Sequence, residues 1–247
     1  MLKLTAHLSI IGVLTVLSQI GGLAWALALV AKRRWLAFPL IYAALSVATV
    51  WIAPLTGRVP LPCTGEAALK VQTPLYCVLN RQYVVPGLKT VLEDHAAQMA
   101  KAHPGTQVRV LDANFPFFDG FPLLPHLSHH DGRKVDLAFY YRKDGAYQPG
   151  LARSPLGYFA FEDGPTDCPR RWLSMRWNMG WLQPLCPDYP LDTARMRTTL
   201  QLLSADKRIS KVFIEPHLAQ SLGASSSKIR FQGCCAARHD DHIHLQL

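Results

Sequence analysis

The sequence predicts an α+β protein in which a small antiparallel sheet with flanking helices follows a two-helix transmembrane hairpin. Three observations support this prediction. The first 56 residues contain two long apolar runs. The remainder mixes short alternating segments with helical periodicity in no regular βαβ order, and histidines gather at two places in it. We therefore divide the 247-residue chain into a membrane anchor, 1–56, and one exported domain, 57–247.

Each apolar run is long enough to cross a bilayer. No Asp, Glu, Lys or Arg lies between Leu4 and Ala31 or between Trp35 and Gly57, and about 20 apolar residues suffice for a helical span. We expect helices at about 4–31 and 35–56. The basic cluster Lys32–Arg34 between them favours the cytoplasmic side. The chain would then enter from outside, turn in the cytoplasm and leave again.

A cleaved signal peptide is the alternative for residues 1–31, because Lys3 could form its charged start and small residues end the run. The run is longer than a typical signal core, and cleavage would leave the basic cluster outside the membrane. We therefore prefer the hairpin.

All six cysteines follow the second apolar run, which suits an oxidising compartment and allows up to three disulfides. Spacing makes Cys63 with Cys77 and Cys168 with Cys186 plausible local pairs, but it does not fix the connectivity. The sequence contains no C-x-x-C pair, which argues against a zinc site made of cysteines.

The formal net charge is +9, and four of the basic residues belong to the anchor, so the exported domain carries +5. Solvated surface charge explains this surplus. The basic and aromatic repeats of nucleic-acid-binding proteins are missing, so we expect no nucleic-acid partner.

Periodicity in the exported domain predicts two helices and four strands separated by long irregular segments. We expect helices at 88–102 and 191–204, strands at 107–111, 135–141, 211–214 and 242–247, a loop at 114–130 and irregular chain at 145–190. A loop as long as the one at 114–130 is usually functional in a compact domain.

Two of these strands place candidate functional residues on one face. Asp136, Ala138 and Tyr140 alternate with apolar residues in the first, as His242 and His244 do in the last. The apolar faces should meet the core, so we expect Asp136 to point into a cleft.

Six of the ten histidines lie in the runs HLSHHDGRKVD (126–136) and HDDHIH (239–244). Histidine and carboxylate are common zinc ligands, and three protein ligands leave a position for water in a catalytic site. A tight turn at Gly132 could bring His129 beside Asp136. His244 would complete the triad, and His242 would approach the bound water or the substrate oxygen.

These runs resemble the LAS-type zinc metallopeptidases, which include the penicillin-insensitive murein endopeptidases, the D-Ala-D-Ala peptidases and the hedgehog signalling domain. The family pattern S-H-x-x-G-x-x-x-D, followed far downstream by H-x-H, matches Ser128, His129, Gly132, Asp136, His242 and His244. The murein endopeptidases are the closer match, because they carry a further histidine three residues before each motif, as His126 and His239 do here. The match rests on about 20 residues of the chain.

The resemblance implies that His129, Asp136 and His244 bind one catalytic Zn²⁺ and that His242 is the catalytic histidine. It further implies hydrolysis of peptide cross-links of peptidoglycan, of the D-alanyl to meso-diaminopimelyl type, by a metal-activated water. Peptidoglycan peptides would be the substrate. The domain would face the periplasm from a bacterial inner (cytoplasmic) membrane.

Other candidate groups lie near these ligands: His126, His239, Asp241, Glu215, Tyr140 and Arg133. The two histidines could contact substrate or support the ligands. The two acidic residues are rival bases to the catalytic histidine. The tyrosine could line the cleft, and the arginine could hold a substrate carboxylate or remain solvated.

Two other functions stay open. A D,D-carboxypeptidase or dipeptidase on the same fold would need a closed pocket with a cation for the terminal carboxylate, whereas an endopeptidase needs an open groove. A non-catalytic zinc-binding interaction domain, as among the hedgehog relatives, would be favoured by a missing base, and His242 argues against it.

Overall fold

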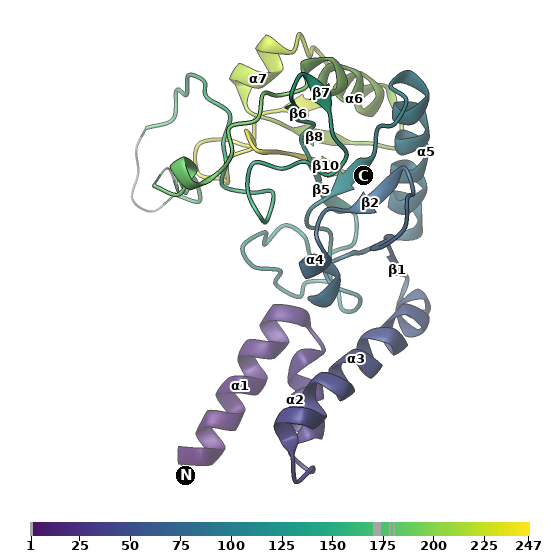
Figure 1. The fold of residues 1–247 in the computed structure, drawn as a ribbon, viewed down its shortest axis with the longest axis vertical. Coiled ribbons are helices and arrows are strands. Elements are labelled where there is room, and N and C mark those ends of the chain that lie inside the picture. Colours follow the sequence, from purple (N-terminus) through teal and green to yellow (C-terminus); the bar gives the residue numbers. More distant parts are fainter. Residues whose placement is uncertain (1, 170–173, 178, 180) are drawn as a thin grey trace.

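A computed structural model describes residues 2–169, 174–177, 179 and 181–247. It shows a helical N-terminal unit that leads into a mixed α+β domain (Figure 1). Among the described residues, one helix, Arg34–Thr56, is long and apolar enough to cross a membrane by its length and composition.

The N-terminal unit differs from the expected pair of helices. It contains α1 (Leu2–Ser18), α2 (Gly21–Ala28) and α3 (Arg34–Ile52), which continues as η1 (Ala53–Thr56). The single helix expected at 4–31 is broken at Gln19, which has a φ of 66°, and α2 runs back along α1. Gly22 makes this close approach feasible, because a Cβ there would lie 2.6 Å from the Ile11 carbonyl oxygen.

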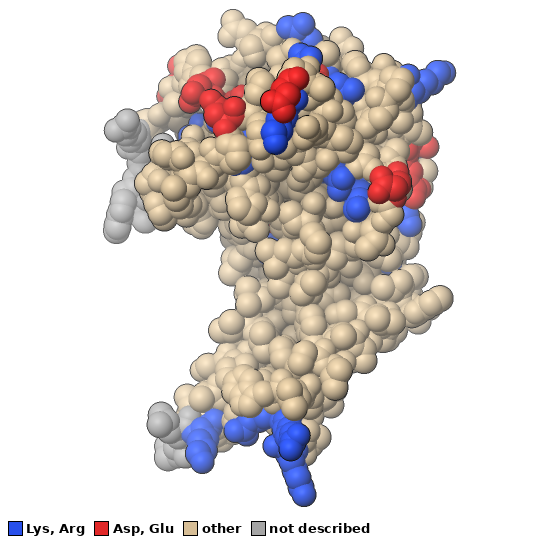
Figure 2. All heavy atoms as spheres, viewed as in Figure 1, with Lys and Arg blue, Asp and Glu red and all other residues tan. Residues whose placement is uncertain are grey.

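The N-terminus and the connection between α2 and α3 both lie at the end of this unit away from the domain (Figure 1). Its basic side chains gather at the same end (Figure 2). The expected two-helix hairpin, with the chain start across the membrane from Lys32–Arg34, is therefore not confirmed. The added reversal at Gln19 places the N-terminus and Lys32–Arg34 at the same end of the N-terminal unit.

The domain is built on one mixed six-stranded sheet with the order β2-β4-β5-β10-β8-β9. Its strands are β2 (Leu69–Val71), β4 (Val108–Val110), β5 (Lys134–Ala138), β8 (Lys211–Phe213), β9 (Ile229–Arg230) and β10 (His242–Gln246). The four central strands are antiparallel, as expected, whereas β2 with β4 and β8 with β9 are parallel edge pairs. Two short pairs lie outside the sheet: β1 (Val59–Pro60) with β3 (Tyr83–Val84), and β6 (Arg142–Lys143) with β7 (Ala146–Tyr147).

Helices α5 (Pro86–Ala102) and α6 (Thr193–Ala205) pack against the sheet (Figure 1). Apolar residues of α5 at helical spacing, such as Leu88, Leu92 and Met99, are fully buried in the same core as Leu137 and Ile243 of the central strands. The short helices α4 (Pro74–Val78), α7 (Pro216–Ser221) and η2 (Gln183–Leu185) lie in the connecting segments. The predicted helices and strands are therefore present, with β5 shorter than expected.

Two disulfides join the irregular segments. The expected pair Cys63–Cys77 is confirmed. The expected pair Cys168–Cys186 is wrong, because Cys168 is bonded to Cys234, and Cys186 and Cys235 are free. The chain before β10 folds back against the segment that holds Cys168, which places the two Cα atoms 5.2 Å apart. Proximity along the sequence could not reveal that contact.

The buried histidine of α5, His95, should make the protein sensitive to acid. Neither ring nitrogen has a hydrogen-bond partner within the described ranges, and burial lowers its pKa to about 4. At a pH below about 6.5, the ordinary pKa of histidine, His95 binds a proton in the unfolded chain but not in the folded chain. The free energy of unfolding therefore falls as the pH is lowered. We expect a loss of about 3 kcal/mol between pH 6.5 and pH 4.

Urea unfolding at several pH values measures this loss. In His95→Leu that part of the pH dependence should disappear, whereas the exposed control variant His130→Leu should retain it. An unchanged pH profile in His95→Leu would contradict the assignment.

Candidate metal centre

The register of the two central strands brings the predicted site together. In the antiparallel pair β5–β10, Asp136 lies directly opposite His244, and Ala138 lies opposite His242. Leu137 and Ile243 point to the opposite face, into the core. The alternation of the sequence therefore places Asp136, His242 and His244 on the sheet face turned away from the apolar core.

The loop between β4 and β5 supplies the third member, His129. Its Nδ1 donates to the Ala113 carbonyl oxygen at 2.7 Å, which leaves Nε2 free to face the strands. The expected turn is present: Gly132 has a φ of 74°, and its N–H donates to the Asn114 side chain at 3.0 Å. A Cβ at Gly132 would also lie 2.6 Å from Arg58 Nε, so glycine is needed there.

His129, Asp136 and His244 converge and could hold a metal ion. His129 Nε2 lies 3.0 Å from His244 Nδ1 and 3.3 Å from Asp136 Oδ1, and the last two atoms are 2.8 Å apart. Ligands about 2 Å from a shared cation in tetrahedral geometry have such separations. The Gln246 amide lies 3.0 Å from His244 Nε2, so each histidine is also held on its outer nitrogen.

The charges of the triad suit a cation. Burial alone would raise the pKa of Asp136, but the surrounding His129, His242 and His126 hold it well below its usual value. Burial lowers the pKa of His244 to about 4, so this ring is neutral, as a ligand must be. Burial also disfavours the charged form of His129, but the interaction with the Asp136 carboxylate is stronger and raises the pKa of His129. A cation would therefore compete with a proton for this site.

His242 forms a hydrogen-bonded pair beside the triad. Its Nδ1 lies 2.5 Å from Asp241 Oδ1, and its Nε2 faces Asp136 Oδ1 at 3.8 Å. The other Asp241 oxygen accepts from the Phe159 N–H at 2.7 Å, which fixes the carboxylate. Burial lowers the pKa of His242, but Asp136 and Asp241 outweigh this and raise it to about 9. The ring can therefore donate a proton from Nε2 at neutral pH.

A buried ion pair lies behind the site. Arg81 binds both oxygens of Asp112, at 2.6 and 2.5 Å, and Asp112 Oδ2 lies 2.9 Å from His126 Nδ1. Tyr158 donates to Asp136 Oδ2 at 2.8 Å, which orients the candidate ligand. The sequence reading missed Arg81, Asp112 and Tyr158. A usable signal existed only for Asp112, an acidic residue directly after the predicted strand at 107–111.

Removal of the arginine should destabilise the protein strongly. Arg81→Met leaves the Asp112 carboxylate buried with one fewer partner, so we expect a loss of about 3–5 kcal/mol in the free energy of unfolding. Urea denaturation checks the value. The double variant Arg81→Met/Asp112→Leu, which removes both charges, should recover part of the loss. Equal stability of wild type and Arg81→Met would refute this role.

His126 and His239 both face the triad. A cavity of about 220 Å³ is lined by these two, by His129, Asp136, His242 and His244, and by Pro125, Leu127, Ser128, Met175, Gln232, Ala236 and Ala237. Burial and the neighbouring histidines lower the pKa of His239 well below its usual value, so it is neutral. Its Nδ1 has no hydrogen-bond partner in the described parts of the chain, which leaves it available to a bound molecule.

Three candidates do not line the triad cavity. Tyr140 is buried with its hydroxyl 3.2 Å from Thr199 of α6, because β5 ends at Ala138 and the alternation does not continue. Arg133 is exposed before the start of β5. Glu215 is held by Arg176 at 3.1 and 2.8 Å, so its carboxylate is already paired.

A comparison with models of known protein families gives no match, and a search of curated proteins gives none either. The assignment of a function therefore depends on the chemistry of this site.

Proposed function

We propose that the chain is a zinc-dependent peptidase that hydrolyses peptide cross-links of peptidoglycan, of the D-alanyl to meso-diaminopimelyl type. The observation that carries this proposal is the convergence of His129 Nε2, Asp136 Oδ1 and His244 Nδ1 on one cavity. Two imidazoles and one carboxylate are a common donor set of hydrolytic zinc sites, which keep a fourth position open. The resemblance of the two histidine runs to the LAS-type metallopeptidases supports the substrate class.

The chain's own groups can perform the acid–base steps. Bound zinc would supply Lewis acidity to a coordinated water and to the scissile carbonyl. His242 presents Nε2 to the same cavity, and Asp241 holds its other nitrogen. The ring can therefore donate a hydrogen bond to the developing oxyanion or a proton to the leaving amine. His239, with its unpaired Nδ1, can contact the substrate.

The cavity lining favours an endopeptidase over a carboxypeptidase. A carboxypeptidase needs a cation for the terminal carboxylate. No Lys or Arg is among the described residues that line the triad cavity. Arg238 lines the adjoining hollow, but it is paired with Asp240 at 2.9 Å.

We propose that α3 anchors the protein in a bacterial cytoplasmic membrane and that the domain faces the periplasm. The apolar segment Arg34–Thr56 and the two disulfides support this location. The basic residues gathered at the far end of the N-terminal unit favour the cytoplasmic side for that end.

The test is incubation of the full-length protein in detergent with cross-linked muropeptide dimers, with and without a chelator, and analysis of the products by mass. Conversion of dimers to monomers that stops with chelator and returns with zinc is expected. Loss of terminal D-alanine alone would support the carboxypeptidase. Intact dimers in the presence of bound zinc would refute the proposal and favour a binding domain.

A further inference from the structure

One edge of the domain is unusually apolar. It consists of α4 and the loop 114–130, and we call it the apolar edge. Five large hydrophobic side chains there are between 43% and 74% exposed: Leu75, Val78, Phe118, Leu124 and Leu127. A cluster of this kind on a soluble surface commonly marks a protein or membrane contact.

The apolar edge is attached to the N-terminal helices. The Gln19 side chain, at the turn between α1 and α2, accepts from the Phe117 N–H at 2.8 Å and donates to its carbonyl oxygen at 2.7 Å. Tyr42 of α3 donates to the Val78 carbonyl oxygen at 2.5 Å. Figure 1 shows α4 directly above these helices. The apolar edge therefore continues the apolar surface of the N-terminal unit.

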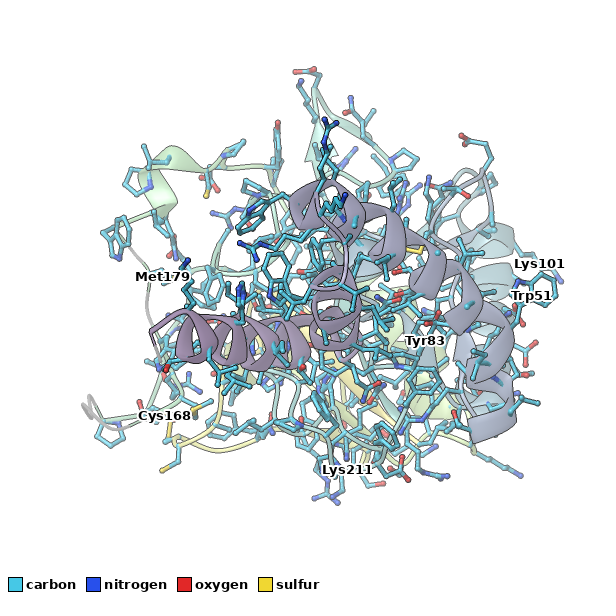
Figure 3. All side chains as sticks on the ribbon, turned by 90° about the horizontal axis from the view of Figure 1, so that it is seen from below. Trp51, Tyr83, Lys101, Cys168, Met179 and Lys211 are labelled. Atoms are coloured by element: carbon cyan, nitrogen blue, oxygen red, sulfur yellow. A yellow bond between two sulfur atoms is a disulfide. The ribbon has the colours of Figure 1, made fainter. Side chains whose placement is uncertain are left out.

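The exposed side chains of the N-terminal unit indicate that a lipid bilayer covers both this unit and the apolar edge. Trp51 near the end of α3 projects outward (Figure 3) and is exposed, as are Leu36, Leu40 and Val47 along the same helix. If α3 crosses a bilayer, its domain end and the apolar edge meet the outer leaflet together. Tryptophan is enriched at this depth.

The apolar edge also leads to the metal centre. Leu127 lines the triad cavity. A second cavity of about 180 Å³ is lined by Leu75 and Leu79 at α4 and, on its inner side, by His126 and Tyr158. His126 lines both cavities. The two cavities are therefore adjacent, so a lipid chain lying against α4 would lie next to a peptide bound at His129, Asp136 and His244.

We propose that the substrate of this site is a peptide carried on a membrane lipid. The apolar chain of the lipid stays in the outer leaflet against the apolar edge while its peptide enters the triad cavity. The reaction remains hydrolysis: the C–N bond breaks, water gives its hydroxyl to the carbonyl carbon, and the amine takes the proton. This inference rests on the proposed function and specifies its substrate class.

The first experiment tests the membrane contact without activity. Full-length protein in phospholipid vesicles carries the photoreactive residue benzoylphenylalanine in place of Phe118 or Val78. The matched control carries it at Leu185 of η2, which is 79% exposed and lies outside the apolar edge. Phospholipid adducts at the first two positions and none at the control are expected. The absence of adducts at Phe118 and Val78 would overturn the inference, whatever the activity.

The second experiment compares one cross-linked peptide, free or joined to a palmitoyl chain, as substrates in the same vesicles. We expect kcat/KM to be at least about tenfold higher for the lipid-linked form. Phe118→Ser/Val78→Ser should reduce that ratio toward one and keep the rate with free peptide, whereas Leu185→Ser should keep the ratio.

The outcomes separate the two proposals. Equal rates with both peptides would overturn the lipid inference and leave the peptidase proposal intact. Hydrolysis of neither peptide by zinc-loaded wild type would refute the peptidase, and with it this substrate class.

Discussion

Substitution of His129 by alanine should remove tight metal binding and lower kcat/KM by roughly a thousandfold or more. His129 is 1% exposed and places Nε2 within 3.3 Å of the other two candidate ligand atoms. Its loss leaves two protein donors in a buried cavity, too few to fix a hydrolytic zinc ion. Metal analysis and turnover of muropeptide dimers measure the two effects.

The neighbouring His130 is a matched control. It is exposed, one position along the chain, and lies outside the triad. His130→Ala should keep wild-type metal content and turnover. Retention of both properties by His129→Ala would show that this residue is not a ligand.

Substitution of His242 by alanine should lower kcat by about 10²–10⁴-fold with little change in metal content. The reason is that His242 presents a protonated Nε2 to the triad cavity and is not itself one of the three converging residues. Asp241→Asn should cause a smaller loss, about 10–100-fold, because it removes the charge that orients the ring.

Steady-state kinetics together with metal analysis separates these roles. His103→Ala, a histidine that contacts Thr198 far from the site, is the control. Loss of metal together with activity in His242→Ala would instead make His242 a ligand. Full activity would exclude it from the proton transfer.

The sequence predicted the members of the triad because each lies in a local pattern with a defined geometry, and the pairing of β5 with β10 then brings them together. A strand has a period of two, so Asp136 and His244 had to share a sheet face once β5 and β10 paired. The positive φ at Gly132 similarly follows from the need for a tight turn after His129. Strand alternation and one glycine turn, together with the resemblance of the two histidine runs, therefore predicted the cluster that could hold a metal ion.

Features that depend on distant contacts could not be read in this way. The break at Gln19 lies within an uncharged apolar run, where the polar pair Ser18–Gln19 and the pair Gly21–Gly22 gave a turn signal that the length of the run outweighed. The bond between Cys168 and Cys234 joins residues 66 positions apart. The position of Tyr140 depends on where β5 ends, and Tyr158 comes from a segment with no periodicity.

The most direct test of the central claim is the zinc K-edge X-ray absorption spectrum of full-length protein, with zinc content per chain measured on the same sample. We predict one zinc per chain with nitrogen and oxygen ligands only, from His129, Asp136 and His244. Failure to take up zinc, or a sulfur ligand in its first shell from Cys186 or Cys235, would contradict the account.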